Sequence, residues 1–211
     1  MLTLKEHTMN LLPESVENQL KNNPIKLNLG CGYNHMAGYV NVDKFDTSQP
    51  DWTMDMEQSP WALPDDCVSE VVMTHVLEHI GREAEVYMAV LQQLYRVCVD
   101  GALIQIVVPH PRHDNFVADP THVRPVTPLG LSLLDREKCE YWTQNGFANT
   151  PLALYYNIDF VTENTVFDFE ARWMDQFHRG ELTEAQLFEA EQNHNNVVSQ
   201  YRFTLRVRKA K

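Results

Sequence analysis

Short apolar runs recur along the first half of the chain, and each ends at a glycine, a proline or a polar residue. They are IKLNL before Gly30, GYVNVD ending at Asp43, VSEVVMT before His75 and GALIQIVVP ending at Pro109. Between the last two, residues 82–97 carry apolar side chains at helical spacing, which predicts a helix with one buried face. Strands that alternate with helices form parallel βαβ units, so the sequence predicts an α/β fold with a doubly wound, mostly parallel sheet.

The second half of the chain predicts a further helix and two late strands. Residues 127–145 begin with Thr127-Pro128 and end before Gly146, which indicates a helix capped at both ends. LALYYNIDFV and VVSQYRFTLRVRK alternate like strands, and LTEAQLFEAEQNHN between them has helical spacing with Thr183 as its N-cap. Since no normal crossover joins the two strands, we expect them to pair antiparallel at an edge of the sheet.

We expect the 211 residues to form one domain. Residues 1–24 predict a helical extension around PESVENQLKNN, residues 25–150 a layered core, and residues 151–211 the late strands with a helical insertion. The aromatic side chains of this last part belong either to the core or to a cover over a binding pocket. Its helical piece is a surface element or the contact of a homodimer.

The charge of the chain limits the partners that we expect. Its formal net charge is -12, and so acidic a surface repels nucleic acid and anionic lipid. We therefore expect neither a nucleic acid nor a membrane as a partner. MLTLKEHTMNLL does not have the pattern of a signal peptide, and no apolar run is long enough to span a bilayer. The four separated cysteines indicate free thiols, so we expect a cytoplasmic protein.

The stretch LNLGCGYNHMAGYVNVD combines a glycine turn with an acidic residue. Gly30-Cys31-Gly32 follows the first strand, and glycines there let the backbone bend sharply and approach a ligand. Asp43 ends the second strand, at the edge where parallel sheets bind ligands, and its carboxylate can accept hydrogen bonds from both hydroxyls of a ribose. In the alternative, the glycines only make a tight turn and the aspartate only caps one.

This stretch departs from a dinucleotide fingerprint. His35 occupies the position that the fingerprint reserves for glycine or alanine, and Asp43 comes earlier than an acid about 20 residues on. YNHMAGY is also too short for a crossover helix whose N-terminus would bind a pyrophosphate. A ligand with a ribose but without phosphates therefore fits this stretch better.

Four landmarks together resemble the class I S-adenosylmethionine-dependent methyltransferases over residues 25–150. They are LNLGCG, NVD, DMEQSPWALPDDCVSEVVMTHVLEHI and LYRVCVDGALIQIVVP. The resemblance implies a Rossmann-like α/β/α sandwich, methyl transfer as the activity and S-adenosyl-L-methionine as the cofactor. The chain departs from the family pattern in its shortened first crossover and in the missing third glycine of the turn, near Asn34 and His35.

The resemblance implies cofactor contacts in the loops after the first four strands. The glycine turn faces the methionine part of the cofactor, Asp43 holds the ribose and Asp55 meets the adenine amino group. Met56 flanks the adenine ring, and the loop after the fourth strand lines the cofactor. The cofactor residues implied in this way are Leu29, Gly30, Cys31, Gly32, Asp43, Lys44, Asp55, Met56, Thr74, His75 and His79.

The loop after the fourth strand also spells a zinc-protease pattern, because His75-Val-Leu-Glu78-His79 reads H-x-x-E-H. Zinc ligation by both histidines requires them on one face of a helix. SEVVM before the pattern favours a strand, Gly81 interrupts a helix, and a third ligand would have to come from elsewhere. We therefore expect a loop here and no metal, with a cap of the following helix as an alternative role for Glu78.

A histidine-rich loop, PHPRHDNFVADPTHVRPVTP, follows the fifth strand, which in this family borders the pocket of the methyl acceptor. A hydroxyl or protonated amine must lose a proton during methyl transfer, and histidine suits the role of base. We expect His110 or His122 as the base and Asp114 or Asp119 as its orienting partner, with His113 as a further candidate. In the alternatives, these side chains satisfy the backbone of the loop, or His110, His113, Asp114 and His122 hold a divalent metal.

The sequence thus predicts methyl transfer from S-adenosyl-L-methionine to an oxygen or nitrogen of a small polar acceptor. Sugars, natural-product intermediates and amino-acid derivatives all fit this expectation of a small-molecule partner. The rival in another class is a non-catalytic cofactor-binding module that acts through a partner protein. A metallohydrolase is a third, less favoured alternative.

Overall fold

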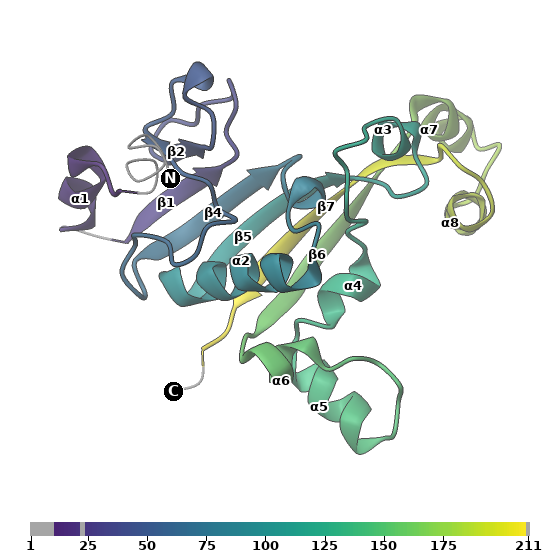
Figure 1. The fold of residues 1–211 in the computed structure, drawn as a ribbon. Helices are drawn as coiled ribbons and strands as arrows, with labels where there is room; N and C mark the ends of the chain where they lie inside the picture. Colours follow the sequence, from purple (N-terminus) through teal and green to yellow (C-terminus); the bar gives the residue numbers. More distant parts are fainter. Residues whose placement is uncertain (1–10, 22–23, 210–211) are drawn as a thin grey trace.

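The chain forms a seven-stranded sheet in a computed structural model that describes residues 11–21 and 24–209 (Figure 1). The strand order is β3-β2-β1-β4-β5-β7-β6. The pairings among β1 to β5 are parallel, and β7 runs antiparallel to both of its neighbours. The strands are β1 (Ile25–Leu29), β2 (Val40–Asp43), β3 (Trp52–Thr53), β4 (Val68–Thr74), β5 (Cys98–Pro109), β6 (Phe160–Phe169) and β7 (Val198–Val207). The predicted doubly wound, mostly parallel sheet with an antiparallel C-terminal part is confirmed.

The central strands hold the core and direct their ends to one edge of the sheet. Leu27 of β1 pairs in register with Val40 of β2 and with Val71 of β4, and all three side chains are completely buried. Ile104 and Ile106 extend this apolar layer into β5. Because β1, β2, β4 and β5 are parallel, their carboxyl ends lie along the same edge, where open α/β sheets bind their ligands.

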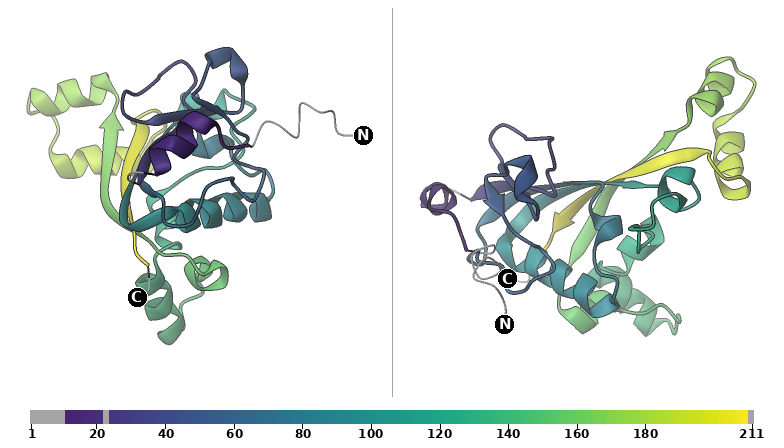
Figure 2. Two further views of the ribbon diagram at one scale, coloured as in Figure 1. Left: turned by 90° about the vertical axis from the view of Figure 1, so that its left-hand side faces the viewer. Right: turned by 45° about the horizontal axis from the view of Figure 1, so that its top comes forward.

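Helix α2 packs on the sheet, and several other helices lie near its ends (Figure 1). Figure 1 shows α2 in front of β4 and β5, where its side chains Met88, Leu91 and Leu94 are buried. In the same figure α3, α7 and α8 gather near the start of β7, and Figure 2 shows them far from α1. The helices are α1 (Glu14–Leu20), α2 (Ala84–Val97), α3 (Asp114–Val117), α4 (Pro128–Ser132), α5 (Arg136–Gln144), α6 (Leu152–Tyr156), α7 (Ala171–His178) and α8 (Glu184–Asn193), with the 3-10 turns η1 (Asp46–Ser48) and η2 (Leu77–His79).

Two segments fold differently from the sequence prediction. The single helix expected over residues 127–145 is divided into α4 and α5, because the Asp135 carboxylate accepts hydrogen bonds from the first amides of α5 and starts a second helix. The strand expected over LALYYNIDFV begins only at Phe160. Its first part forms α6 instead, and Asn157 ends that helix in the left-handed conformation.

Other local predictions agree with the structure. Thr183 caps α8 in a capping box with Gln186. Residues 30–39 connect β1 to β2 without a helix, as the short YNHMAGY segment predicts. The four cysteines are buried and free. Among the residues that the structure describes, no helix combines the length and apolarity that crossing a membrane requires.

Candidate functional site

Two adjoining cavities lie at the carboxyl ends of the parallel strands. The glycine-turn cavity has a volume of about 450 Å³ and the strand-five cavity one of about 730 Å³, within the usual range of ligand sites. The glycine-turn cavity is lined by Gly30, Asp43, Lys44, Phe45, Asp55, Met56, Glu57, His75, Val76, His79, Ile80 and Thr121. The strand-five cavity is lined by His75, His79, Pro109, Asn115, Ala118, Asp119, Pro120 and His122. The two cavities therefore share His75 and His79.

The glycine turn after β1 packs tightly against the loop after β4. Gly30 has a φ of +66°, and a Cβ atom at this position would lie 2.4 Å from Cγ2 of Val76. A side chain is excluded there both by the backbone conformation and by this contact. Cys31 beside it is buried, and burial raises the pKa of its thiol to about 11, so the thiol stays protonated. The turn thus offers backbone to the cavity rather than a nucleophile.

Asp43 at the end of β2 is oriented by the glycine turn. The amide of Gly32 donates a 2.9 Å hydrogen bond to its Oδ2 atom, and the amide of Phe45 donates a 2.9 Å bond to Oδ1. Each carboxylate oxygen has capacity for a further hydrogen bond, because an ionised carboxylate accepts at about four positions. Asp43 is therefore held in place to accept a pair of hydroxyl groups from a ligand in the cavity.

A buried network of side-chain amides on β1 and β2 holds the segment that follows the glycine turn. This network was not predicted from the sequence. Asn28 of β1 donates from Nδ2 to the carbonyl of Asn34 (2.8 Å) and to Oδ1 of Asn41 (3.0 Å). The amide of Met36 donates to the same Oδ1 atom (2.7 Å), and Asn41 Nδ2 donates to Oδ2 of Asp51 (2.8 Å). Asparagine at inward positions of two apolar strands was the sequence signal for this network.

The loop after β4 is fixed at both of its ends. His75 has a φ of +54°, which is uncommon for a residue with a side chain, and its amide donates a 2.8 Å hydrogen bond to the carbonyl of Val107. At the other end Gly81 has a φ of +68°, and a Cβ atom there would lie 2.5 Å from the backbone nitrogen of Tyr87. Its amide donates to Oε1 of Glu57 at 2.6 Å. The expectation of a loop at H-x-x-E-H, with η2 as its only helical turn, therefore agrees with the structure.

His75 and Glu78 form a pair at the junction of the two cavities. The Glu78 side chain is completely buried, and its Oε1 atom lies 3.4 Å from Nδ1 of His75, whose side chain is about half exposed. This contact raises the pKa of His75. A hydrogen bond with the side chain of Gln200 raises the same pKa further.

The segment after α3 lies beside η2 and forms the opposite wall of the strand-five cavity. The amides of Val123 and Arg124 both donate to the carbonyl of Glu78, at 2.9 and 3.1 Å. As a result the ring of His122 packs edge-on against the ring of His79, with centroids 4.6 Å apart. Asp119 Oδ2 lies 3.8 Å from Nε2 of His122, in the pairing that the sequence predicts.

The other predicted catalytic residues lie outside both cavities. His110 is buried, its Nδ1 accepts the amide of Arg112, its Nε2 lies 3.0 Å from Glu191 of α8, and burial lowers its pKa. His113 caps α3 through Nδ1 and contacts Glu170 through Nε2 at 3.1 Å. Asp114 donates its backbone amide to Asn196, between α8 and β7. These residues join the start of the loop to the C-terminal insertion.

The structure brings most of the predicted cofactor residues into one cavity, namely Gly30, Asp43, Lys44, Asp55, Met56, His75 and His79. Leu29, Cys31, Gly32 and Thr74 are not among its lining residues; Leu29 and Cys31 are buried, and Gly32 acts through its amide. Phe45, Glu57, Val76, Ile80 and Thr121 line the cavity without having been predicted. Each of the first four directly follows a predicted residue, so adjacency could have indicated them, whereas no sequence pattern pointed to Thr121.

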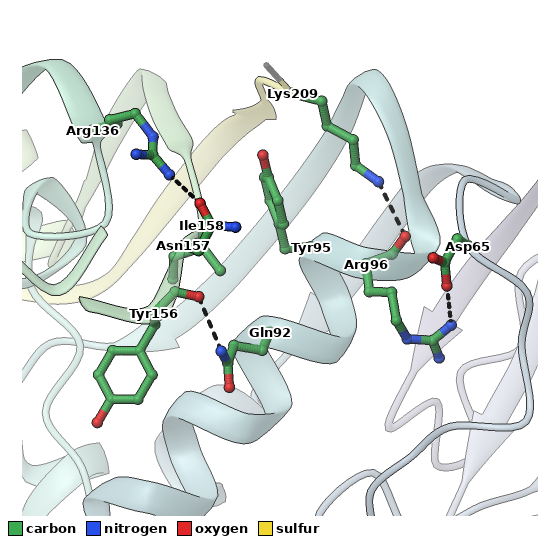
Figure 3. A pocket seen from close by; sticks show the side chains of 9 residues that line it. All are labelled: Asp65, Gln92, Tyr95, Arg96, Arg136, Tyr156, Asn157, Ile158 and Lys209. Carbon is green, nitrogen blue, oxygen red and sulfur yellow. Dashed lines mark hydrogen bonds and ion pairs between the residues drawn. The ribbon is translucent and has the colours of Figure 1, made fainter. Parts of the chain in front are cut away.

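A third cavity, of about 470 Å³, lies beside α2 and α6 (Figure 3). It contains cationic side chains, but these have partners within the protein. Arg96 pairs with Asp65 at 2.7 Å, and Arg136 donates to Oδ1 of Asn157 at 2.7 Å. Lys209 donates to the carbonyl of Arg96. This cavity is remote from the strand ends that hold the glycine turn, so it is the weaker candidate for a ligand site.

Known proteins resemble this chain in structure but not in sequence. Neither the models of known protein families nor the curated proteins give a match to the sequence. An S-adenosylmethionine-dependent methyltransferase from Archaeoglobus fulgidus is 17% identical, with 96% of this chain and 98% of that chain covered and a TM-score of 0.54. One from Methanosarcina mazei is 10% identical, with 95% and 100% covered and a TM-score of 0.51. The [4+2]-cyclase SpnF is 11% identical, with 89% and 76% covered and a TM-score of 0.52.

One expectation about partners is corrected by these neighbours. The net charge of the chain predicts a small-molecule acceptor and no nucleic acid. The similar structures include the 16S rRNA methyltransferase KamB, at 11% identity, 94% and 95% coverage and a TM-score of 0.48. The exclusion, which rested on net charge alone, is therefore wrong, and a small-molecule acceptor is not established. The acceptor stays unassigned.

The strand order, the glycine turn and the structural neighbours agree with one another. The resemblance that the sequence shows to class I methyltransferases is confirmed at the level of the fold, while the presence of a cyclase among the neighbours shows that the fold alone does not determine the chemistry. The chain has the Rossmann-like fold of the S-adenosylmethionine-dependent methyltransferases.

Proposed function

We propose that the protein transfers a methyl group from S-adenosyl-L-methionine to an oxygen or nitrogen atom of its acceptor. The main support is the wall of His75 and His79 that the glycine-turn cavity and the strand-five cavity share. Methyl transfer is an in-line displacement at a sulfonium, so the donor and the acceptor must approach the methyl group from opposite sides. Two cavities that meet at one wall provide this arrangement.

The glycine-turn cavity is assigned to the cofactor. Asp43, held by the amides of Gly32 and Phe45, would accept hydrogen bonds from the ribose hydroxyls. Asp55 and Met56, which line the same cavity, would contact the adenine. The acidic side chains in the lining also suit a ligand with a cationic sulfonium.

We assign the removal of the acceptor's proton to His75, which the sequence analysis placed among the cofactor contacts. His75 lines both cavities and has its Nδ1 atom beside Glu78, so Nε2 is the ring atom to which we assign the proton. His122 and Asp119, which were predicted as base and partner, line the strand-five cavity but not the glycine-turn cavity. We assign no catalytic role to His110, His113 or Asp114, because their contacts indicate that they hold the loop in place.

Calorimetry with S-adenosyl-L-methionine and S-adenosyl-L-homocysteine tests the proposal. We expect both to bind, and Asp43→Ala to weaken binding at least about tenfold, since a hydrogen bond to a charged group contributes about 1.5–3 kcal/mol. Asp175→Ala, which removes an exposed acid of α7, is the matched control and should leave the affinity unchanged. Absence of binding by both ligands, or equal affinity in Asp43→Ala, would refute the proposal.

A further inference from the structure

Glu78 is a buried acid without an adequate partner. Its side chain is completely buried, and neither carboxylate oxygen has a hydrogen-bond partner among the residues that the structure describes. Nδ1 of His75 lies 3.4 Å from the Oε1 atom of Glu78, which is too long for a strong charge-assisted hydrogen bond. Buried carboxylates are normally paired, hydrogen-bonded or bound to a metal ion.

Two histidines direct nitrogen atoms toward this carboxylate. Within the described residues, potential ligand atoms of Glu78, His79 and His122 all lie within 4.8 Å of one another. We infer that these three side chains bind one divalent transition-metal ion at the wall of the strand-five cavity. Metal–ligand distances are about 2.0–2.2 Å, so the side chains would close on the ion by a movement of about 1 Å.

One hydrogen bond fixes the protonation of the His122 ring, and its Nε2 atom lies 3.8 Å from Asp119 Oδ2, beyond hydrogen-bond distance. Nδ1 lies 2.9 Å from the carbonyl oxygen of Phe116, which can only accept a hydrogen bond. Nδ1 must therefore carry the proton, and Nε2 presents a lone pair.

Hydrogen bonds fix the proton of the His79 ring on Nδ1 as well. The hydroxyl of Thr121 donates to Oδ1 of Asp119 at 2.6 Å, so its oxygen accepts from Nδ1 of His79 at 2.9 Å. The carbonyl of Thr121, 3.3 Å from the same nitrogen, also requires a proton there. Nε2 of His79 is thus the unprotonated nitrogen. Ligating histidines in proteins are typically oriented by such a hydrogen bond from the second ring nitrogen.

The backbone keeps the three ligands together without the metal. Because the amides of Val123 and Arg124 bind the carbonyl of Glu78, the segment that carries His122 is anchored to the turn that carries His79. The guanidinium of Arg124 adds a 2.6 Å hydrogen bond to the carbonyl of Gly81 and lies over the ring of Tyr87. The site is therefore assembled from two loops that the fold already holds in contact.

The three ligands favour certain types of ion and leave coordination positions of that ion open. Two imidazoles and one carboxylate suit Mn²⁺, Fe²⁺, Co²⁺ or Zn²⁺ better than Mg²⁺ or Ca²⁺, which prefer oxygen ligands. His79 and His122 both line the strand-five cavity, so the open positions would face an acceptor. An ion there would polarise an acceptor oxygen and favour loss of its proton. This role rests on the proposed function, whereas the metal site itself does not.

Titration of the chelator-treated, desalted protein with Co²⁺, in the absence of any cofactor, tests the site. We expect one ion per chain, seen by calorimetry and by the visible absorption of Co²⁺ in a protein site. Glu78→Gln and His122→Ala should weaken binding more than about 100-fold, and Thr121→Val should weaken it about tenfold by releasing His79. His178→Ala, an exposed histidine of α7, should leave binding unchanged.

Several outcomes would overturn the inference. Absence of stoichiometric binding, or wild-type affinity in both Glu78→Gln and His122→Ala, would show that the cluster binds no metal. Loss of binding in His113→Ala with retention in His122→Ala would place the ion at the start of the loop instead. Circular dichroism of each variant controls for folding. S-Adenosyl-L-homocysteine binding, measured on the same samples, separates a failure of the metal site from a failure of the proposed function.

Discussion

The amide of Val123 donates a 2.9 Å hydrogen bond to the carbonyl of Glu78 and so joins the loop after β5 to the loop after β4. This contact places His122 against His79 and closes one side of the strand-five cavity. On the other side His75 faces both cavities, with the Glu78 carboxylate behind its ring. One buried glutamate is therefore the centre around which the histidines of two loops are arranged.

We expect His75→Gln to lower kcat for methyl transfer by about 100-fold or more, because a positioned base contributes about 10²–10⁴ to the rate. The affinity of the His75→Gln variant for S-adenosyl-L-homocysteine should stay within about threefold of that of the wild type. The measurement is transfer of a labelled methyl group to an acceptor found by screening. His178→Gln is the control, and an unchanged kcat in His75→Gln would remove the histidine from its assigned role.

Gly30→Ala should destabilise the fold by about 2–4 kcal/mol. The left-handed conformation costs a residue with a side chain about 1–2 kcal/mol, and the new Cβ atom would also meet Val76 at 2.4 Å. Gly38→Ala is a matched control, since Gly38 has a φ of +81° but no atom within 4 Å of the place that a Cβ atom would take. Gly38→Ala should lower the free energy of unfolding only by the cost of the left-handed conformation. Urea unfolding measures both, and equal losses would argue against tight packing on Val76.

Burial lowers the pKa of His110, and this direction determines how stability changes with pH. Below pH 6.5 the unfolded chain binds a proton at this histidine more readily than the folded chain does, so the free energy of unfolding should fall as the pH falls toward the lowered pKa. The titratable groups that face its ring are Glu191, Arg112, His113 and Tyr201. His110→Asn, in which Oδ1 can replace Nδ1 as acceptor for the Arg112 amide, should show a smaller fall.

Urea unfolding at pH 8 and pH 5.5 measures this difference. His178→Asn serves as a control because that histidine is exposed and should leave the pH dependence of the wild type intact. If the free energy of unfolding of His110→Asn falls between pH 8 and pH 5.5 as much as that of the wild type, another group takes up the proton.

Features set by neighbouring residues could be predicted from the sequence. Gly30 and Asp43 each end an apolar run, so their place at the strand ends followed from the runs themselves. The contact of Asp43 with the Gly32 amide of the same turn followed from the parallel order of β1 and β2. The capped helix α8 was predictable for the same reason, because Thr183 and Gln186 interact within one turn.

Contacts between distant loops could not be predicted in this way. The H-x-x-E-H pattern suggests His75 and His79 as a pair, whereas the structure places His79 against His122 and directs Nδ1 of His75 to Glu78. Similarly, nothing in the loop after β5 distinguishes His110 from His122. The contact of His110 with Glu191 of α8 separates them, and that contact depends on how the C-terminal insertion packs.

The buried amide network under the glycine turn leads to a final prediction. Asn41→Leu would leave the amide of Met36 without its acceptor and the side chain of Asn28 without one of its two acceptors, at a cost of about 1–3 kcal/mol for each unmade buried hydrogen bond. Because these groups hold the turn whose Gly32 amide orients Asp43, we expect the affinity for S-adenosyl-L-homocysteine to fall about tenfold along with stability.

Calorimetry and urea unfolding of the same Asn41→Leu sample separate the two effects. Asn195→Ala removes an exposed amide between α8 and β7 and should change neither quantity by a measurable amount. If Asn41→Leu loses stability but keeps full affinity, the network supports the fold without positioning the turn. Such a result would mean that the Gly32 amide keeps its place beside Asp43 without the network.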